Sequence, residues 1–225
     1  MSNCMIIITK NGPYIVNGNI LIEEKIIISD GNEYKYKDGR KFKQSEKYAL
    51  CRCGKSKTMP FCDGAHLHYN FDGTETASKK IFEDQAKVYE GSDFYLLDAE
   101  NLCAFARFCH RSSSEVWSLT ENSDNSANRE DAIKAACDCP AGRLVAVDRT
   151  TGESIEPYYD PSIIIIQDPE RQCSGPIWIR GRIPIISYDG YKYEIRNRVT
   201  LCRCGHSRNK PFCDASHVMT GFNNI

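Results

Sequence analysis

The chain has 225 residues, 41% of them hydrophobic and 26% charged, and a formal net charge of −1. These values are those of an ordinary globular protein, and they exclude a disordered or fibrous chain and a strongly basic nucleic-acid-binding one. No apolar run approaches the length of a membrane span, and the first residues do not form a secretory signal. We therefore expect a cytoplasmic protein without a membrane or nucleic-acid partner, for which 12 cysteines are many.

The amino-terminal part is predicted to be rich in strands. Ile and aromatic residues favour strands at Met5–Thr9, Tyr14–Glu24 and Ile26–Ser29. A stretch with nine Lys or Arg residues follows at 35–57. We interpret it as a charged, protected strand edge or, alternatively, as a docking surface for an acidic redox partner. It leads into a cysteine motif at 50–66.

The middle part, residues 76–165, differs in character. Apolar residues at helical spacing predict helices at 98–110 and 129–137, with a polar loop between them. Four cysteines lie here: Cys103, Cys109, Cys137 and Cys139. In a regular helix the first two would point about 120° apart, so they can share a metal cluster only if their segment is a loop. The alternative is a small helical insert in which the four cysteines are buried as small apolar residues.

The carboxy-terminal part repeats the amino-terminal one. Strands are expected at Ile163–Gln167 and Pro176–Tyr193, and they lead into residues 201–217, which align with 50–66 without a gap. Farther upstream the two registers differ. The first copy is therefore expected to carry an insertion near Glu23–Lys35.

Both copies offer the same donors, namely Cys-x-Cys, then eight residues, Cys, three residues and His. Three thiolates and one imidazole suit zinc or an iron–sulfur cluster. The predicted ligands are Cys51, Cys53, Cys62 and His66 in the first copy and Cys202, Cys204, Cys213 and His217 in the second. The remaining histidines do not recur at this offset, and they are expected at the surface: His68, His110 and His206.

Three other uses of the cysteines were weighed. Disulfides are disfavoured because the expected compartment is reducing and a Cys-x-Cys bridge would close a strained ring. Structural zinc sites usually recruit Cys-x2–4-Cys knuckles, which these copies lack, but a zinc-binding structural or interaction protein stays the alternative. A thiol-dependent oxidoreductase using the middle cysteines is weaker, because no nucleotide-binding glycine fingerprint or Cys-x-x-Cys pair is present.

The two copies closely resemble the CDGSH iron–sulfur family, whose motif is C-x-C-x2-[S/T]-x3-P-x-C-D-G-[S/A/T]-H. The first copy has every fixed position, whereas the second has Ala215 in place of Gly, where a methyl group restricts φ or crowds the cluster. The resemblance implies a 2Fe–2S cluster in each copy, with the two Cys-x-Cys thiolates on one iron and the Cys and His on the other. Arg52 and Arg203, between the paired cysteines, are expected to donate hydrogen bonds to cluster sulfurs or to partner carboxylates.

The family also implies a fold. Its members bind their clusters in a dimer whose strands pair into a small β-sandwich. Two copies in one chain would build this arrangement internally, in a monomer with a pseudo-twofold axis. The chain resembles the soluble prokaryotic kind rather than the membrane-anchored animal relatives.

The middle cysteines resemble those of single-cluster bacterial ferredoxins, which have Cys-x5-Cys and a distant Cys-Pro. This resemblance implies a 3Fe–4S or 4Fe–4S cluster on Cys103, Cys109 and Cys139, with Cys137 as an unusual fourth ligand.

Together the patterns predict an α+β protein, with a small antiparallel β-sandwich-like unit built as an intrachain pseudo-dimer and a mainly helical insert. The expected units are 1–75, 76–165 and 166–225. An imidazole in place of a thiolate raises the reduction potential, and protons compete with the metal for it, so the clusters should be acid-labile. Such clusters pass single electrons without an open site for substrate. This favours electron transfer, redox sensing or cluster transfer to a protein partner over enzymatic activity.

Overall fold

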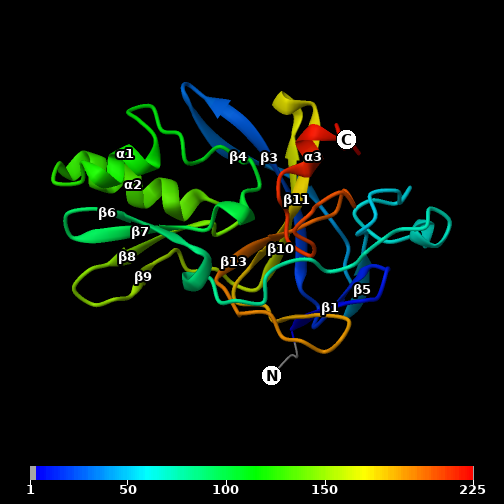
Figure 1. Ribbon diagram of the computed structural model, residues 1–225. Helices are drawn as coiled ribbons and strands as arrows, with labels where there is room; N and C mark the ends of the chain where they lie inside the picture. Colours follow the sequence, from blue (N-terminus) through cyan, green and yellow to red (C-terminus); the bar gives the residue numbers. More distant parts are fainter. Residues whose placement is uncertain (1–3, 225) are drawn as a thin grey trace.

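The computed structural model describes residues 4–224 and is built mainly from β-sheets, with few helices in that part of the chain (Figure 1). Three sheets have the strand orders β12-β1-β2-β5, β13-β11-β10-β3-β4 and β6-β7-β8-β9. The expected mixed α+β class is confirmed. None of the described helices is long and apolar enough to cross a membrane.

The elements follow one another along the chain with short connections. The strands are β1 (Met5–Ile8), β2 (Tyr14–Asn17), β3 (Leu21–Asp30), β4 (Glu33–Lys41), β5 (Lys47–Leu50), β6 (Lys87–Glu90), β7 (Phe94–Asp98), β8 (Leu144–Asp148), β9 (Ser154–Ile155), β10 (Ser162–Asp168), β11 (Cys173–Arg180), β12 (Ile185–Ile186) and β13 (Arg198–Leu201). The helices are α1 (Val116–Glu121), α2 (Ser126–Asp138) and α3 (Ser216–Met219), and short 3₁₀ turns lie at Ala65–Leu67, Glu83–Gln85, Glu100–Leu102 and Pro169–Arg171.

The two motif copies exchange strands with each other. In the first copy β1 pairs with β2 and β2 with β5, and in the second β10 pairs with β11 and β11 with β13, all antiparallel. The third strand of each copy crosses over: β3 lies parallel to β10, and β12 lies parallel to β1. Each copy therefore completes the sheet of the other. Because β10 begins at Ser162, the expected unit boundary at 165 falls inside this strand.

One apolar core lies between these two sheets. Alternate residues of β1 and β2, such as Ile6 and Val16, pack against alternate residues of β10 and β11, such as Ile163 and Ile177. This is the period of two that strands impose on side chains. Burial of this core holds both motif copies in place.

The expected insertion in the first copy is the hairpin of β3 and β4. Tyr36 on this hairpin stacks on Phe108 of the middle segment, with ring centroids 4.5 Å apart, and also packs on Trp178 of β11. The insertion thus supports the middle segment. The long strand expected at 14–24 is interrupted instead by a turn in which Gly18 and Asn19 have positive φ.

The middle segment is not mainly helical, and that expectation was wrong. Its four strands form an antiparallel sheet, and α1 and α2 cover one face of it. The expected helix at 129–137 lies within α2. The expected helix at 98–110 does not form, because only the turn at Glu100–Leu102 is helical and an extended loop follows.

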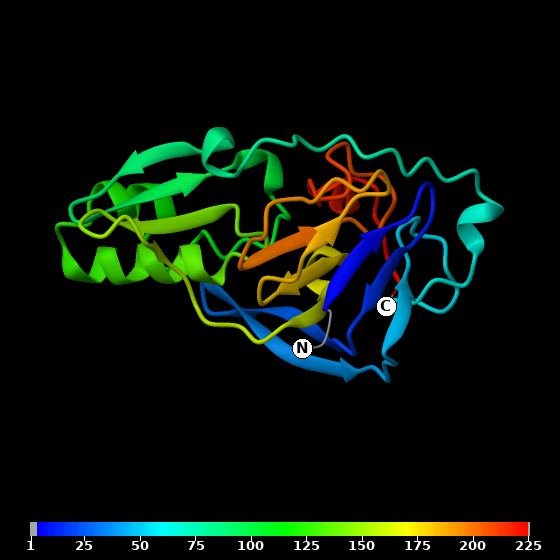
Figure 2. The ribbon, with the colours of Figure 1, turned by 90° about the horizontal axis from the view of Figure 1, so that it is seen from below.

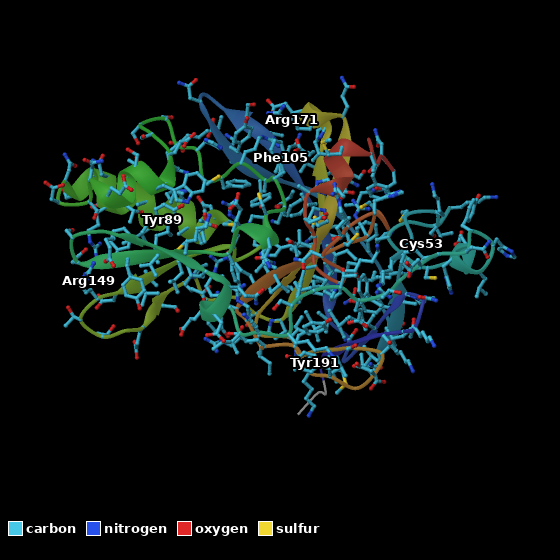
Figure 3. All side chains as sticks on the ribbon, in the orientation of Figure 1. Cys53, Tyr89, Phe105, Arg149, Arg171 and Tyr191 are labelled. Atoms are coloured by element: carbon cyan, nitrogen blue, oxygen red, sulfur yellow. The ribbon has the colours of Figure 1, made fainter. Side chains whose placement is uncertain are left out.

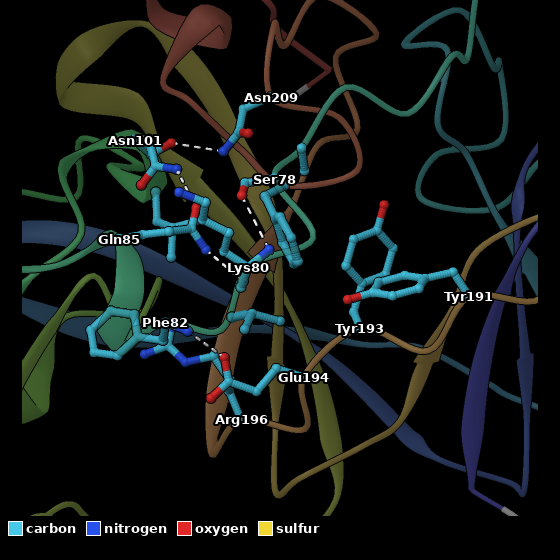
Figure 4. Close-up of a pocket in the computed structure, with 14 residues that line it drawn as sticks. Ser78, Lys80, Phe82, Gln85, Asn101, Tyr191, Tyr193, Glu194, Arg196 and Asn209 are labelled. Atoms are coloured by element: carbon cyan, nitrogen blue, oxygen red, sulfur yellow. Dashed lines mark hydrogen bonds between the residues drawn. The ribbon is translucent and has the colours of Figure 1, made fainter.

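The molecule is elongated, with the middle segment at one end (Figure 2). The carboxy-terminal segment, red in Figures 1 and 2, lies between the green middle segment and the cyan segment that follows β5. The linker from the first copy to the middle segment runs along the second copy, where Phe82 N–H donates to Glu194 Oε2 at 2.6 Å (Figure 4). Linker residues and side chains of the second copy, such as Tyr193 and Arg196, line a small cavity of about 30 Å³ there.

Candidate metal centres

Both cysteine motifs begin where a strand ends. In the first copy Cys51 N–H donates to Pro60 O at 2.8 Å and Cys62 N–H donates to Ala49 O at 2.9 Å, so the loop returns to the strand that it left. The second copy repeats these bonds at the same lengths, from Cys202 to Pro211 and from Cys213 to Thr200. The repeated sequence therefore builds the same loop twice.

The predicted ligands come together as pairs. Cys51 Sγ lies 3.7 Å from Cys53 Sγ, and Cys62 Sγ lies 3.5 Å from His66 Nδ1. The corresponding distances in the second copy are 3.6 Å between Cys202 and Cys204 and 3.4 Å between Cys213 and His217. Two donors on one tetrahedral ion, with bonds of about 2.0–2.3 Å, stand roughly 3.5–3.8 Å apart. Each pair thus has the spacing of two ligands on one metal. Within residues 4–224, no group of three or more His, Cys, Asp or Glu side chains converges as around a single ion.

One thiol of each Cys-x-Cys pair is prepared for ligation. A hydrogen bond from Cys53, together with backbone N–H groups of Ser56 and Gly54, lowers the pKa of Cys51 to about 6 despite burial. Cys204 and the N–H groups of the equivalent loop lower the pKa of Cys202 to about 6 in the same way. Because thiolates are the ligating form, both pairs already hold one negative charge near neutral pH.

The two sites differ in burial. Cys213 and His217 are only 3% and 4% exposed, whereas Cys62 and His66 are half-buried. Burial lowers the pKa of His217 to about 4, and the nearby charge of Arg203 lowers it further. The second site therefore keeps its imidazole neutral, which is the form that binds metal. The three other histidines, His68, His110 and His206, are exposed, as expected.

The departure of the second motif from the family pattern is accommodated by backbone conformation. Ala215 has φ 68°, close to the 87° of the equivalent Gly64. A Cβ placed on Gly64 would have no atom within 4 Å, so the methyl group finds open space. The extra carbon therefore brings backbone strain but does not crowd the site.

Arg52 and Arg203 have a different role from the expected one. Both are buried, and their guanidinium groups bond backbone carbonyls: Arg52 those of Thr9, Gly12 and Gly73, and Arg203 those of Gly175 and Ile166. These carbonyls lie in the strands and loops beside each motif. The two arginines thus fix the Cys-x-Cys loops to the body of the protein.

The two Cys-x-Cys loops lie directly against each other. A Cβ on Gly205 would stand 2.6 Å from Cys53 O, and a Cβ on Gly54 would overlap Cys204 O. Tyr14 Oη donates across the copies to Cys202 O at 2.7 Å. The two candidate centres therefore share a tightly packed backbone contact that only glycine permits.

Three of the middle cysteines line one cavity. Cys103, Cys109 and Cys139 surround it together with Ala106, Arg143 and neighbouring residues. The segment from Cys103 to Cys109 is an extended loop, which is the condition for the two to share a cluster. Two of its residues, Phe105 and Arg107, have positive φ, a strained conformation held by the ion pair of Arg107 with Asp168 and by its position 4.3 Å over the Tyr34 ring.

Cys137 is not part of this group. It lies one position from the end of α2 and its thiol donates to Ile155 O at 3.4 Å, on a different side of the helix from the cavity. Burial raises the pKa of Cys109 to about 12, and the charges of Cys139 and Cys103 raise it further. A bound cation would reverse this effect, because a coordinating thiol is deprotonated by the metal.

Sequence reasoning missed the arginines around this cavity. Arg143 forms a bidentate ion pair with Asp98 and lies over the Trp117 ring. Arg198, 1% exposed, donates to the carbonyls of Cys139, Ala136 and Leu144. No motif marks these residues, and their roles follow only from the packing of β13 on the middle segment.

Comparison with known protein families agrees with this arrangement. The family model described as "iron-binding zinc finger CDGSH type" matches residues 11–67 and 174–218, and the model described as "divergent 4Fe-4S mono-cluster" matches residues 89–149. The chain is thus an iron–sulfur protein of the CDGSH type. It carries two CDGSH regions, with a ferredoxin-like region between them. Neither a curated protein nor a solved structure matches the chain.

Proposed function

We propose that this protein binds a 2Fe–2S cluster in each CDGSH region and transfers single electrons. In the first region Cys51 and Cys53 would hold one iron and Cys62 and His66 the other; the second region would use Cys202 and Cys204, then Cys213 and His217. The pairwise spacing of 3.4–3.7 Å is the observation that carries this proposal. Two separate donor pairs suit the two metals of a binuclear cluster, whereas a structural zinc ion needs four donors around one point.

The two CDGSH regions are proposed to form an internal pseudo-dimer within a monomer. The reciprocal exchange of β3 and β12 supports this symmetry, and so do the reciprocal contacts of Gly54 and Gly205. A cluster bound by three thiolates and one imidazole has no open coordination position, so electron transfer suits it better than substrate chemistry. We expect the protein to act in the cytoplasm.

The middle region is proposed to hold a third cluster, of the 3Fe–4S or 4Fe–4S type, on Cys103, Cys109 and Cys139. The cavity that these three thiols share supports this assignment, as does the loop that carries two of them. Bacterial ferredoxin motifs have a cysteine three residues after the first, and here that position is Ala106. Three protein thiolates leave one cluster corner without a cysteine ligand, which favours the 3Fe–4S type.

Cluster transfer from the first region is a second candidate function. Its Cys62 and His66 are half-buried, so a partner protein can reach this pair more easily than the buried pair of the second region. A labile imidazole ligand near the surface suits a cluster that is released to an acceptor.

Anaerobic purification followed by iron, sulfide and zinc analysis tests these proposals, together with visible absorption and EPR spectra. About four iron atoms per chain are expected from the two binuclear clusters, and about seven or eight if the middle region is also loaded. A colourless protein with zinc and no acid-labile sulfide would support the structural zinc alternative and refute the electron-transfer function.

A further inference from the structure

A ligand of the second CDGSH site and one of the middle site lie in a single apolar cluster. Cys213 packs with Ala104 and Ala141, all three at most 5% exposed, and Cys139 packs against them. Ala104 follows Cys103 in the loop of the middle site, and Ala141 follows Cys139 by two positions. The two candidate centres are therefore separated by small side chains and contain no exposed surface between them.

The same strand fixes both centres. β13 ends at Leu201, directly before Cys202, and its first residue, Arg198, donates to Cys139 O at 2.8 Å. Arg196 donates to Gly142 O at 2.6 Å, and a Cβ on Gly142 would stand 2.6 Å from Arg198 O. On the other side, Asn209 in the loop of the second site donates to Asn101 O at 2.9 Å, just before Cys103 (Figure 4). The spacing of the two centres is thus held rigidly.

The first CDGSH site stands on the far side of the second. Its Cys53 lies against Gly205, and Figure 3 shows Cys53 well apart from Phe105, which belongs to the loop of the middle site and lies beside Arg171. The order along the molecule is therefore middle site, second site, first site, as the two ribbon views also show (Figures 1 and 2).

We propose that the contact of Cys213 with Ala104, Ala141 and Cys139 is an electron-transfer junction between the middle site and the second CDGSH site. This inference rests on the proposed function, in which both sites hold clusters. One electron leaves the reduced middle cluster and reduces the oxidised second one, and no bond, proton or ligand changes place. The electron enters from an external one-electron donor, which is dithionite in the test below.

Ligand chemistry sets the direction of transfer. The middle cavity offers thiolates alone, whereas the second site has an imidazole, and replacing a thiolate by a neutral imidazole raises the reduction potential. The buried second site is shielded from a donor in solution, with Cys213 and His217 at most 4% exposed, while the loop of the middle site reaches the surface at Phe105. Electrons should therefore reach the second site through the middle one.

The junction is tested by the rate at which dithionite reduces each CDGSH cluster, followed by rapid-freeze EPR. H66C and H217C variants, each of which changes the signal of one site, assign the two signals. In a C109S variant, which removes a middle ligand, reduction of the second site should slow severalfold and reduction of the first far less. C137S is the matched control, because Cys137 is a half-buried cysteine of the same region that lies outside the cavity, and it should change neither rate.

A second measurement needs no substitution. In the wild-type protein, the EPR signal of the second site should become severalfold harder to saturate at potentials where the middle cluster is paramagnetic, whereas the first signal should change less. Equal effects on both sites, or no effect with all clusters present, would overturn the junction alone. Wild-type protein that lacks the middle signal and its iron would instead overturn the proposed middle cluster, and the junction with it.

Discussion

Gly54 and Gly205 are the positions at which the contact between the two motif loops can be tested most directly. Both have positive φ, 74° and 85°. A Cβ on either would meet backbone atoms of the opposite loop, at Cys204 O or Cys53 O. Backbone carbonyls cannot rotate away as a flexible side chain can, so an added methyl group must push the loops apart.

The expected destabilisation has two parts. Positive φ costs an alanine about 1–2 kcal/mol, and overpacking of a closely packed contact costs about 1–3 kcal/mol. G54A and G205A should therefore each lower the free energy of unfolding by about 2–5 kcal/mol. G64A is the matched control, because Gly64 has φ 87° but no atom within 4 Å of a Cβ, so only the backbone cost of about 1–2 kcal/mol applies. Ala215 at the equivalent position shows that the fold tolerates this cost.

Urea unfolding of the cluster-loaded protein, followed by far-UV circular dichroism and by cluster absorbance, measures these differences. Iron content is matched between variants beforehand, so that cluster loss is not mistaken for a packing effect. If G54A and G205A destabilised the protein no more than G64A does, the two loops would not be in contact and the proposed internal pseudo-dimer would be wrong.

Three further predictions concern the individual centres. On acidification the first cluster should bleach before the second, because His66 is half-buried whereas burial lowers the pKa of His217 to about 4; that depressed pKa also means that His217 contributes stability above about pH 6.5 which is lost as the pH falls towards 4, and stepwise visible spectra of wild type and H66C test the order. A106C adds a thiol to the wall of the middle cavity and should raise the iron content by about one atom per chain with a changed EPR signal, whereas a thiol at the exposed Ser113 should add none. R198M removes a buried cation from three carbonyl acceptors and should lower the free energy of unfolding by about 3–5 kcal/mol and empty the middle site first, and R198K should not rescue it, because lysine lacks the planar fork; unfolding curves and iron analysis decide.

The repeated motif made most of the two CDGSH regions predictable. Covalent spacing alone places Cys62 and His66 near each other, and the gapless alignment of the two copies indicated that the same loop forms twice. The insertion in the first copy was also predictable, since a shift of register between the copies requires extra residues in one of them. That it is a hairpin supporting the middle segment depends on tertiary contacts, such as the stack of Tyr36 on Phe108, which no local pattern encodes.

The middle region was harder to predict from sequence. Apolar residues at helical spacing predicted a helix at 98–110, but burial of the loop against the β3–β4 hairpin overrides this local preference. The pair of strands β7 and β8 was missed, because short apolar runs such as Phe94–Asp98 do not distinguish a strand from a buried helix segment. The different direction of the Cys137 thiol could not be deduced from a spacing of one residue, since it depends on where α2 ends.

The exchange of strands between the motif copies separates the order of synthesis from the order of assembly. During translation β1 emerges first, yet its parallel neighbour, β12, lies some 180 residues later, so this edge stays open while most of the chain is made. The strands of the middle region pair only with one another and can close earlier. The first cysteine motif to leave the ribosome is therefore among the last to reach its finished surroundings, and iron is best supplied to this protein only after the whole polypeptide has been released.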